Sequence, residues 1–260
     1  MTVRVIAVDM DGTFLRSDMT YDRERFVRLR ERMRAADIRF VVASGNQYWQ
    51  LASFFDGGLV DAFVSENGHF VYEDGERLYS AEQSPDAVRS MIRLLEDGGW
   101  PYLVSGPEGA LMRSDVSAEG WSWASQYFHR LTRVADPREH ADEVVRASFL
   151  AHDPVAAAES VGQALGGSMD AVASGPEDVD LNVPGNNKAV GLGHVLERWG
   201  VDAADVVAFG DNHNDLEMLG VAGLSIAMGN ARPRVQEAAD RLAPSHDEDG
   251  VLVVLEELLS

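Results

Sequence analysis

The stretch VRVIAVDMDGT, residues 3–13, decides the fold. Residues 3–8 are mostly apolar and β-branched, which predicts a short strand buried on both faces in the middle of a parallel sheet. Asp9 and Asp11 follow at the C-terminal end of this strand. Because ligands of open α/β sheets bind outside the carboxyl ends of the strands, we expect both carboxylates at a functional site. A simple Asp-Gly turn is the alternative for so short a motif.

The next segments predict a parallel crossover. Apolar residues at 26, 29, 33 and 36 have the spacing of a surface helix, and residues 38–43 form the next apolar run. A right-handed crossover between the two strands would place Ser44 beside Asp9. Its hydroxyl and the amides of a strand-to-helix turn could hold phosphate oxygens. Alternatively, Ser44 caps a helix expected over residues 47–55, and the two roles are compatible.

A third strand over residues 61–65 leads into a predicted hairpin. The Asn67-Gly68 pair is a strong hairpin signal, with residues 70–72 and 77–79 as the next two strands. A hairpin turn alone accounts for the presence of asparagine and glycine here. A weaker alternative is that the side chain of Asn67 also faces a ligand at the same sheet edge.

The chain changes character from about residue 81. Short strands alternate with helices, and no carboxylate cluster follows a strand, which predicts an inserted α+β module. We therefore predict a core domain of residues 1–82 and 185–260, with the inserted domain at residues 83–184. Trp100, Trp121, Trp123 and Tyr127 are expected in the core of the insertion, and a platform for stacking a sugar is the alternative.

After the insertion, further charged residues occur at the start of a predicted helix and after a predicted strand. Lys188 is the only lysine among 22 basic residues, and it begins a predicted helix. A cation there opposes the helix dipole but can bind an anion together with the helix amides. Asp211 directly follows the apolar strand at residues 206–209, and Asp215 comes one turn later. His213 lies between them, but one histidine is weak evidence for zinc.

Composition limits the possible partners. The net charge of −21 argues against nucleic acid and anionic membranes, and the chain has no cysteine. We find no apolar run long enough to span a bilayer and no secretory signal pattern, so we expect a cytoplasmic protein that can be a monomer.

Four carboxylates can converge at one sheet edge only if a cation offsets their repulsion. Oxygen ligands select a hard ion such as Mg²⁺, which typically binds one or two carboxylates together with a substrate phosphate. The set therefore predicts phosphoryl transfer, in which one carboxylate attacks phosphorus and a second exchanges protons.

The segments DMDGT, SGN, the lysine at a helix start and GDNHND together resemble the four motifs of the haloacid dehalogenase superfamily. Their spacing is similar to that of the Cof-type branch, which carries a large α/β cap between the second and third motifs. ASGNQY, ENG, PGNNKA and DEDGVL resemble the bacterial sugar phosphatases of that branch. The resemblance implies a Rossmann-like parallel-sheet core with an inserted α+β cap domain.

The resemblance also implies a role for each matching residue. Asp9 would be the nucleophile and Asp11 the general acid/base, which also gives Mg²⁺ its backbone carbonyl. Lys188 would neutralise the phosphoryl group. Ser44, the backbone amides of Gly45 and Asn46, and Asn214 would contact the phosphate. Asp211 would bind Mg²⁺ directly, and Asp215 would support the metal site without direct contact. Asn46 stands where a basic residue is frequent in the superfamily, which leaves the choice of substrate open.

The sequence thus predicts a Mg²⁺-dependent phosphatase for small sugar phosphates. Transfer to a second hydroxyl, as in a mutase, and a non-catalytic protein that binds phosphorylated metabolites are the alternatives. The particular sugar phosphate is not specified by these motifs, because the weakly patterned insertion is expected to determine it.

Overall fold

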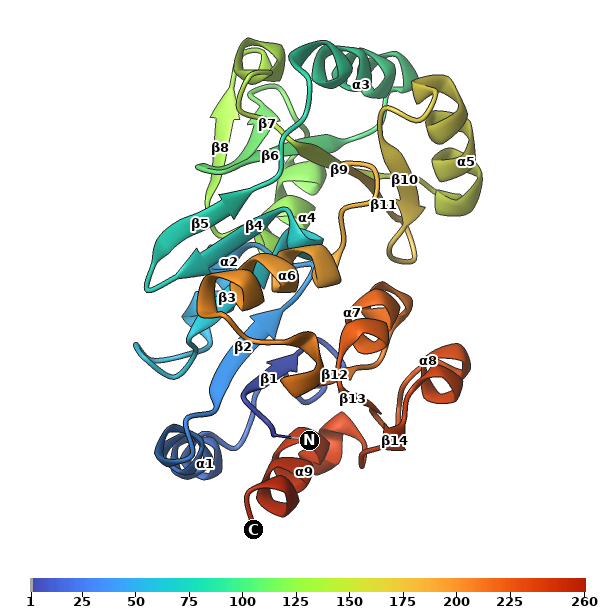
Figure 1. The fold of residues 1–260 in the computed structure, drawn as a ribbon. Helices are drawn as coiled ribbons and strands as arrows, with labels where there is room; N and C mark the ends of the chain where they lie inside the picture. The colour runs from blue at the N-terminus through green and yellow to red at the C-terminus, as the bar shows by residue number, and fades with distance from the viewer. Residues whose placement is uncertain (1) are drawn as a thin grey trace. The chain divides into compact units, whose positions relative to one another are not determined.

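The predicted N-terminal strand, β1 (Val5–Val8), is fully buried in the computed structural model, which describes residues 2–260 (Figure 1). Residue 1, where the first predicted domain begins, lies outside the described residues. The chain divides into two compact units. The first unit runs to Tyr79 and resumes at Asn187–Ser260, and the second unit is Ser80–Asn186.

The first unit is built on an eight-stranded sheet in the order β14-β13-β12-β1-β2-β3-β4-β5. The strands from β14 to β3 are parallel, and β4 runs antiparallel to β3. The seven strands that accompany β1 are β2 (Arg39–Ala43), β3 (Ala62–Ser65), β4 (Phe70–Glu73), β5 (Glu76–Ser80), β12 (Val206–Gly210), β13 (Leu224–Ala227) and β14 (Arg241–Leu242). Strand β5 ends one residue beyond the first unit.

Six α-helices in the described part of the first unit connect these strands: α1 (Arg23–Ala35), α2 (Tyr48–Ser53), α6 (Lys188–Trp199), α7 (Leu216–Val221), α8 (Pro233–Ala238) and α9 (Gly250–Leu258). Four short 3-10 turns accompany them: Glu66–Gly68, Ala203–Asp205, His213–Asp215 and His246–Glu248. Helix α1 packs against α9, and α6 packs against α7 and β3. The apolar residues that the sequence places at helical spacing in α1, including Phe26, Leu29 and Met33, are buried in the core.

The register of the sheet brings the ends of three strands together. Val8 of β1 lies opposite Phe209 of β12 on one side and Val42 of β2 on the other. Because all three strands are parallel, the segments that follow them emerge at the same edge of the sheet. Asp9 is anchored there by its N–H group, which donates to the carbonyl of Phe209 at 3.1 Å.

The second unit has a six-stranded sheet in the order β10-β11-β9-β6-β7-β8, in which only the β7–β8 pair is parallel. Its strands are β6 (Tyr102–Gly106), β7 (Gly109–Arg113), β8 (Leu131–Val134), β9 (Arg146–Leu150), β10 (Asp170–Ala173) and β11 (Asp178–Asn182). Its helices are α3 (Pro85–Gly98), α4 (Ala118–Tyr127) and α5 (Pro154–Leu165), with a 3-10 turn at Pro137–His140. This composition is the α+β pattern expected of the insertion.

Local signals define the helices of the second unit. Ser84 caps α3 by accepting from the N–H group of Ala87, Pro85 occupies the first turn, and Gly99 ends the helix in the left-handed conformation. This arrangement is favoured because proline fixes a helical φ and glycine carries no penalty at positive φ. Serine and proline at the start and glycine at the end are the sequence signals typical of helix termini.

The three tryptophans of the second unit pack against its hydrophobic clusters. Trp100 lies beside Phe149 with ring centroids 5.0 Å apart. Trp121 and Trp123 are partly buried against the cluster that includes Phe128. The prediction for Tyr127 is wrong, because this residue at the end of α4 is 46% exposed. Within the residues that the structure describes, none of the helices is long and apolar enough to cross a membrane.

A buried ion pair ties α1 to the sheet, and we expect its removal to destabilise the first unit. The guanidinium of Arg30 is fully buried and donates to Leu59 O and Asp61 Oδ2, each at 2.7 Å. Burial lowers the pKa of Arg30, against the opposing charge of Asp61. Replacing Asp61 with alanine should reduce the free energy of unfolding by about 2–4 kcal/mol, because a buried charge would lose its partner. Urea unfolding followed by circular dichroism measures this loss.

The matched control is Glu256→Ala, which removes the partner of Arg25 at the surface. The side chain of Glu256 is 46% exposed, so the loss should be below about 1 kcal/mol. Equal losses in the two variants would contradict the assignment of a structural role to the buried pair.

Candidate active site

A lysine between two aspartates forms the centre of the site. Lys188 is fully buried at the first turn of α6, where Asn187 is the N-cap. Its Nζ donates to Asp9 Oδ1 at 2.5 Å and to Asp215 Oδ1 at 2.6 Å. Burial alone would lower the pKa of Lys188, but the charges of Asp215 and Asp9 overcome this effect and raise the pKa. The ammonium group therefore stays charged, and it is held against the first aspartate of the sequence motif.

Asp215 organises the loop that follows β12. While its Oδ1 accepts from Lys188, its Oδ2 accepts from the N–H groups of Asp211 at 2.9 Å and Asn212 at 3.0 Å. Both carboxylate oxygens of this fully buried residue are thus engaged. The arrangement fixes the backbone on which Asp211 is carried.

Asp211 faces the first motif directly. Thr13 Oγ1 donates to Asp211 Oδ1 at 3.0 Å, which joins two loops separated by nearly the whole chain. Gly12 lies between them at φ +76°, and a Cβ atom there would stand 2.6 Å from Asp211 Oδ2. Only glycine fits this position, because a side chain would be both strained and too close to the carboxylate.

Three carboxylates converge at the strand ends. One oxygen from each of Asp9, Asp211 and Asp215 lies within 4.8 Å of the others. Burial first, and then the neighbouring carboxylates, raise the pKa of Asp9 well above its ordinary value, although Lys188 acts in the opposite direction. Burial and Asp215 likewise raise the pKa of Asp211. The cluster has more negative charge than one lysine offsets, as expected of a site for a cation.

Asp11 does not belong to this cluster. Its side chain is exposed, and its Oδ2 accepts from Asn46 Nδ2 at 2.6 Å. Enough protein surrounds the carboxylate to raise its pKa by desolvation, while the hydrogen bond from Asn46 and the charge of Lys188 lower the pKa. The two aspartates of the first motif therefore have different surroundings: Asp9 is buried against a cation, and Asp11 is open to a ligand.

The loop after β2 is closed by the side chain of Ser44. This buried hydroxyl accepts from the N–H group of Asn46 at 3.1 Å, so Ser44 does not cap the following helix. Helix α2 begins instead at Tyr48 with Gln47 as its N-cap, and the capping alternative is wrong. The reason is a tertiary contact: the carbonyls of Ser44 and Asn46 accept from Asn67 and Glu66, which holds residues 44–46 outside the helix.

The turn Glu66-Asn67-Gly68 lies against the same loop. All three residues have positive φ, at 49°, 54° and 88°. Backbone strain of this kind at non-glycine residues is concentrated at functional sites. Asn67 Oδ1 accepts from Asn214 Nδ2 at 3.0 Å, so the predicted phosphate ligand Asn214 meets the residue that the sequence marked only weakly.

Two residues at this edge were not predicted. The first is Thr13, which donates to Asp211. The second is Asn230, whose Nδ2 donates to the carbonyl of Gly12 at 2.8 Å and whose Oδ1 accepts from the N–H group of His246 at 3.0 Å. Asn230 follows shortly after the parallel strand β13. Its place near a strand end is the signal that could have identified it.

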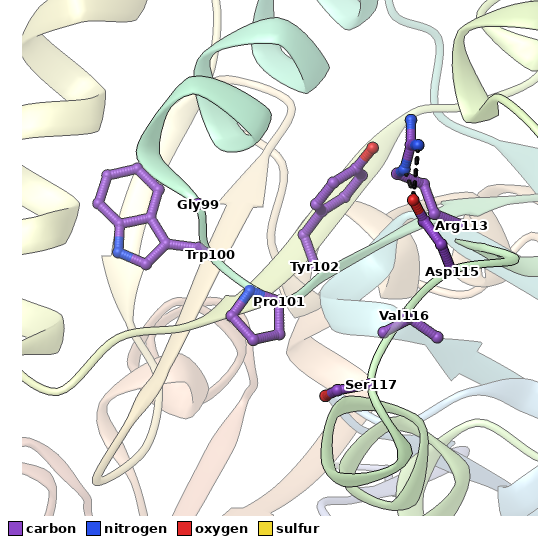
Figure 2. Close-up of a pocket in the computed structure, with 8 residues that line it drawn as sticks. All are labelled: Gly99, Trp100, Pro101, Tyr102, Arg113, Asp115, Val116 and Ser117. Atoms are coloured by element: carbon purple, nitrogen blue, oxygen red, sulfur yellow. Dashed lines mark hydrogen bonds and ion pairs between the residues drawn. The ribbon is translucent and has the colours of Figure 1, made fainter.

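A separate pocket of about 230 Å³ lies in the second unit (Figure 2). It is lined by Gly99, Trp100, Pro101, Tyr102, Arg113, Asp115, Val116 and Ser117. Its charged side chains neutralise each other, because Arg113 makes an ion pair with Asp115 at 2.9 Å and a second with Glu96 at 3.1 Å. We assign the chemistry to the strand ends of the first unit, where the charges are not balanced.

Comparisons with known proteins agree with this geometry. The family model of haloacid dehalogenase-like hydrolases matches residues 6–255. The chain is 39% identical over 263 residues to the 5-amino-6-(5-phospho-D-ribitylamino)uracil phosphatase YbjI of Escherichia coli (strain K12), and the match covers 100% of this chain and 97% of that protein. The crystal structure of SMU.1108c from Streptococcus mutans UA159 is 33% identical with a TM-score of 0.88, covering 99% of each chain.

A more distant structure, the HAD subclass IIB sugar phosphatase BT4131, has a TM-score of 0.82 at 20% identity, covering 98% of this chain and 99% of that one. At this identity the likeness concerns the fold alone. The chain belongs to the haloacid dehalogenase-like hydrolase family. The predicted Cof-type family, the α/β fold class and the enzyme class, a phosphatase, are thereby confirmed.

Proposed function

We propose that this chain is a Mg²⁺-dependent phosphatase that hydrolyses small sugar or sugar-alcohol phosphates through an aspartyl-phosphate on Asp9. The observation that carries the proposal is the buried array of Asp9, Lys188 and Asp215 at the carboxyl ends of β1 and β12. The substrate class is supported by the relative from Escherichia coli, whose name specifies a phosphorylated ribityl compound.

In the first half of the reaction, a carboxylate oxygen of Asp9 attacks phosphorus. The bond between phosphorus and the ester oxygen breaks, and the electron pair leaves with that oxygen. Asp11, protonated at this stage, gives the leaving oxygen its proton, so that the product departs as a neutral alcohol. The Nζ atom of Lys188 donates a hydrogen bond to Asp9 Oδ1, and its positive charge offsets the negative charge of Asp9 and the phosphoryl group.

In the second half, Asp11 acts as a base. It removes a proton from water, and the water oxygen attacks phosphorus of the aspartyl-phosphate. The bond between phosphorus and the Asp9 oxygen breaks, which returns the Asp9 carboxylate and releases inorganic phosphate. Both half-reactions use the same two carboxylates, and Asp11 returns to its starting protonation state.

The donor set fits a magnesium ion. Asp9, Asp211 and Asp215 offer only carboxylate oxygens, which suit a hard cation. In our proposal Asp9 and Asp211 hold the ion directly, with the backbone carbonyl of Asp11. Asp215 supports them, because its two oxygens already accept three hydrogen bonds. Mg²⁺ would neutralise charge on the phosphoryl oxygens during transfer.

The phosphate itself would be held by the loop after β2. The hydroxyl of Ser44 and the backbone amides of Gly45 and Asn46 belong to this loop, at the same sheet edge as Asp9, and Asn214 reaches the edge from the loop after β12. These four assignments remain predictions, as do the cytoplasmic location and the monomeric state. The net charge of −21 supports the expectation that nucleic acid is not a substrate.

Removal of divalent metal should lower activity by at least about 100-fold, because the carboxylate cluster would repel the anionic substrate. The measurement is phosphate release from a panel of hexose, pentose, ribityl and pyridoxal phosphates, before and after treatment with a chelator. Adding back Mg²⁺ serves as the control and should restore the rate. Unchanged turnover in the chelated enzyme would contradict the metal assignment.

The same panel distinguishes the alternative functions. Added alcohols that capture the phosphoryl group in preference to water would indicate a phosphotransferase. Binding of the phosphorylated compounds without turnover of any of them would indicate a binding protein. Release of phosphate to water, strongest for sugar or ribityl phosphates, is the outcome that we expect.

A further inference from the structure

The side chain of Asn46 contacts the acid/base carboxylate rather than open space. Its Nδ2 donates to Asp11 Oδ2 at 2.6 Å, which joins the loops that follow the neighbouring strands β2 and β1. From the sequence, the backbone amide of Asn46 is expected to contact phosphate, and its side chain stands where a basic residue is frequent in the superfamily. The observed hydrogen bond of the side chain points to an additional role.

The backbone of Asn46 is fixed on both sides. Its N–H group donates to Ser44 Oγ at 3.1 Å, and its carbonyl accepts from the N–H group of Glu66 at 3.0 Å. Glu66 itself belongs to the turn with three successive positive φ values. With both backbone groups engaged by neighbouring loops, the backbone position from which the Asn46 side chain extends to Asp11 is fixed.

An amide donor on one oxygen of a carboxyl group determines where its proton lies. When Asp11 is protonated, the hydrogen bond from the Asn46 NH₂ group favours Oδ2 as the carbonyl oxygen, because a carbonyl oxygen is a stronger acceptor than the hydroxyl oxygen of the acid. The proton then resides on Oδ1, the oxygen that is left for the substrate. A cation at position 46 would also bind Asp11, but it would favour the charged form and so oppose the protonated acid.

We propose that Asn46 is a positioning residue that orients Asp11, so that its proton is presented from Oδ1 to the leaving oxygen. This inference rests on the proposed function, in which Asp11 protonates the leaving group. Asn46 acts through Asp11 in this role, and its effect is confined to steps that need a proton.

The test compares two leaving groups in the same enzyme. A p-nitrophenolate leaves without a proton, whereas the alkoxide of a sugar phosphate needs one. In Asn46→Ala, the rate of leaving-group release in the first turnover should fall by about 10–100-fold for a sugar phosphate and by less than about 3-fold for p-nitrophenyl phosphate. The first turnover is measured because the later hydrolysis of the aspartyl-phosphate uses Asp11 as a base with either substrate. KM should change little for either substrate. The variant Asn46→Leu keeps a similar size without the donor and without a charge, and it should show the same selective loss.

The variant Asp11→Asn calibrates the experiment, because it removes the acid itself and should give the same pattern in the first turnover with a larger amplitude. Its steady-state turnover should fall for both substrates, because the base of the second half-reaction is also lost. Equal losses for both substrates in the Asn46 variants would mean that Asn46 holds the phosphoryl group, and this would overturn the inference. Unchanged rates for both substrates would also overturn it. A wild-type chain that turns over neither substrate would instead overturn the proposed function, so the two failures are distinguishable.

Discussion

Asp9→Asn is expected to lower phosphate release by more than about 10⁴-fold, because it removes the proposed nucleophile. Asparagine has nearly the same shape as aspartate, but its neutral amide does not attack phosphorus. The hydrogen bond from Lys188 to Asp215 would remain, and with it much of the local structure. The loss should therefore appear in kcat, with circular dichroism and the unfolding midpoint close to those of the wild type.

A sharper readout is the covalent intermediate. Wild-type enzyme quenched during turnover of a labelled substrate should carry one acyl phosphate that hydroxylamine releases, and Asp9→Asn should carry none. Asp86→Asn is a suitable control, because the side chain of Asp86 is 99% exposed on α3. Activity of Asp9→Asn above about 1% of the wild type would be incompatible with Asp9 as nucleophile.

Lys188→Met should cause the second large loss, about 10³-fold in kcat. The ammonium is fully buried between Asp9 and Asp215, so its removal leaves two carboxylates facing each other without a counter-charge. Stability should also fall, by about 3–5 kcal/mol, because breaking a buried ion pair on one side is strongly destabilising. Lys188→Arg should not restore the rate, because the planar guanidinium does not match a site shaped for a compact charge.

A double variant separates the two effects of Lys188→Met. Lys188→Met with Asp215→Asn removes one of the uncompensated carboxylates, and an asparagine oxygen can still accept from the N–H groups of Asp211 and Asn212. Stability measured by urea unfolding should recover in part, while activity should stay low. Recovery of activity together with stability would show that Lys188 serves only the structure.

Much of the fold followed from a simple property of the sequence. The buried strands of the parallel sheet are short apolar runs, and two of them, β1 and β12, stop at the carboxylates Asp9 and Asp211. A run of this kind has one favourable environment, the middle of a parallel sheet. The location of the strand and the location of the carboxylate that follows it, at the edge of the sheet, could therefore be predicted together. The lone lysine was informative for a similar reason, since a cation at a helix N-terminus is unfavourable without an anion nearby.

Elements at the edge were harder to predict. Strand β8 (Leu131–Val134) was not predicted, because its residues are only partly buried or exposed and β7 is its one partner in the sheet. Its place is set by pairing with β7 rather than by its own pattern of burial. Edge strands of this type have a weak signal in any single sequence.

Side-chain contacts across loops could not be predicted either. That Asn46 reaches Asp11, and that Asn230 supports Gly12, depends on how three strand-end loops meet, which no spacing along the chain specifies. The interpretation of Ser44 as a helix cap was wrong for the same reason, since contacts from Asn67 and Glu66 determine where α2 begins. Residue types at the site could be predicted, but the pairings among them could not.

The interruption of the first unit by residues 80–186 has a consequence for how the protein is made. Strand β1 leaves the ribosome early, but its neighbour β12 is translated about 200 residues later, which corresponds to a delay of roughly 10–40 s at ordinary rates of synthesis. During that interval one edge of an apolar strand lacks its partner, a state that favours association with other chains. The second unit is continuous in sequence and can form first, so the nascent protein acquires its inserted part before its catalytic centre.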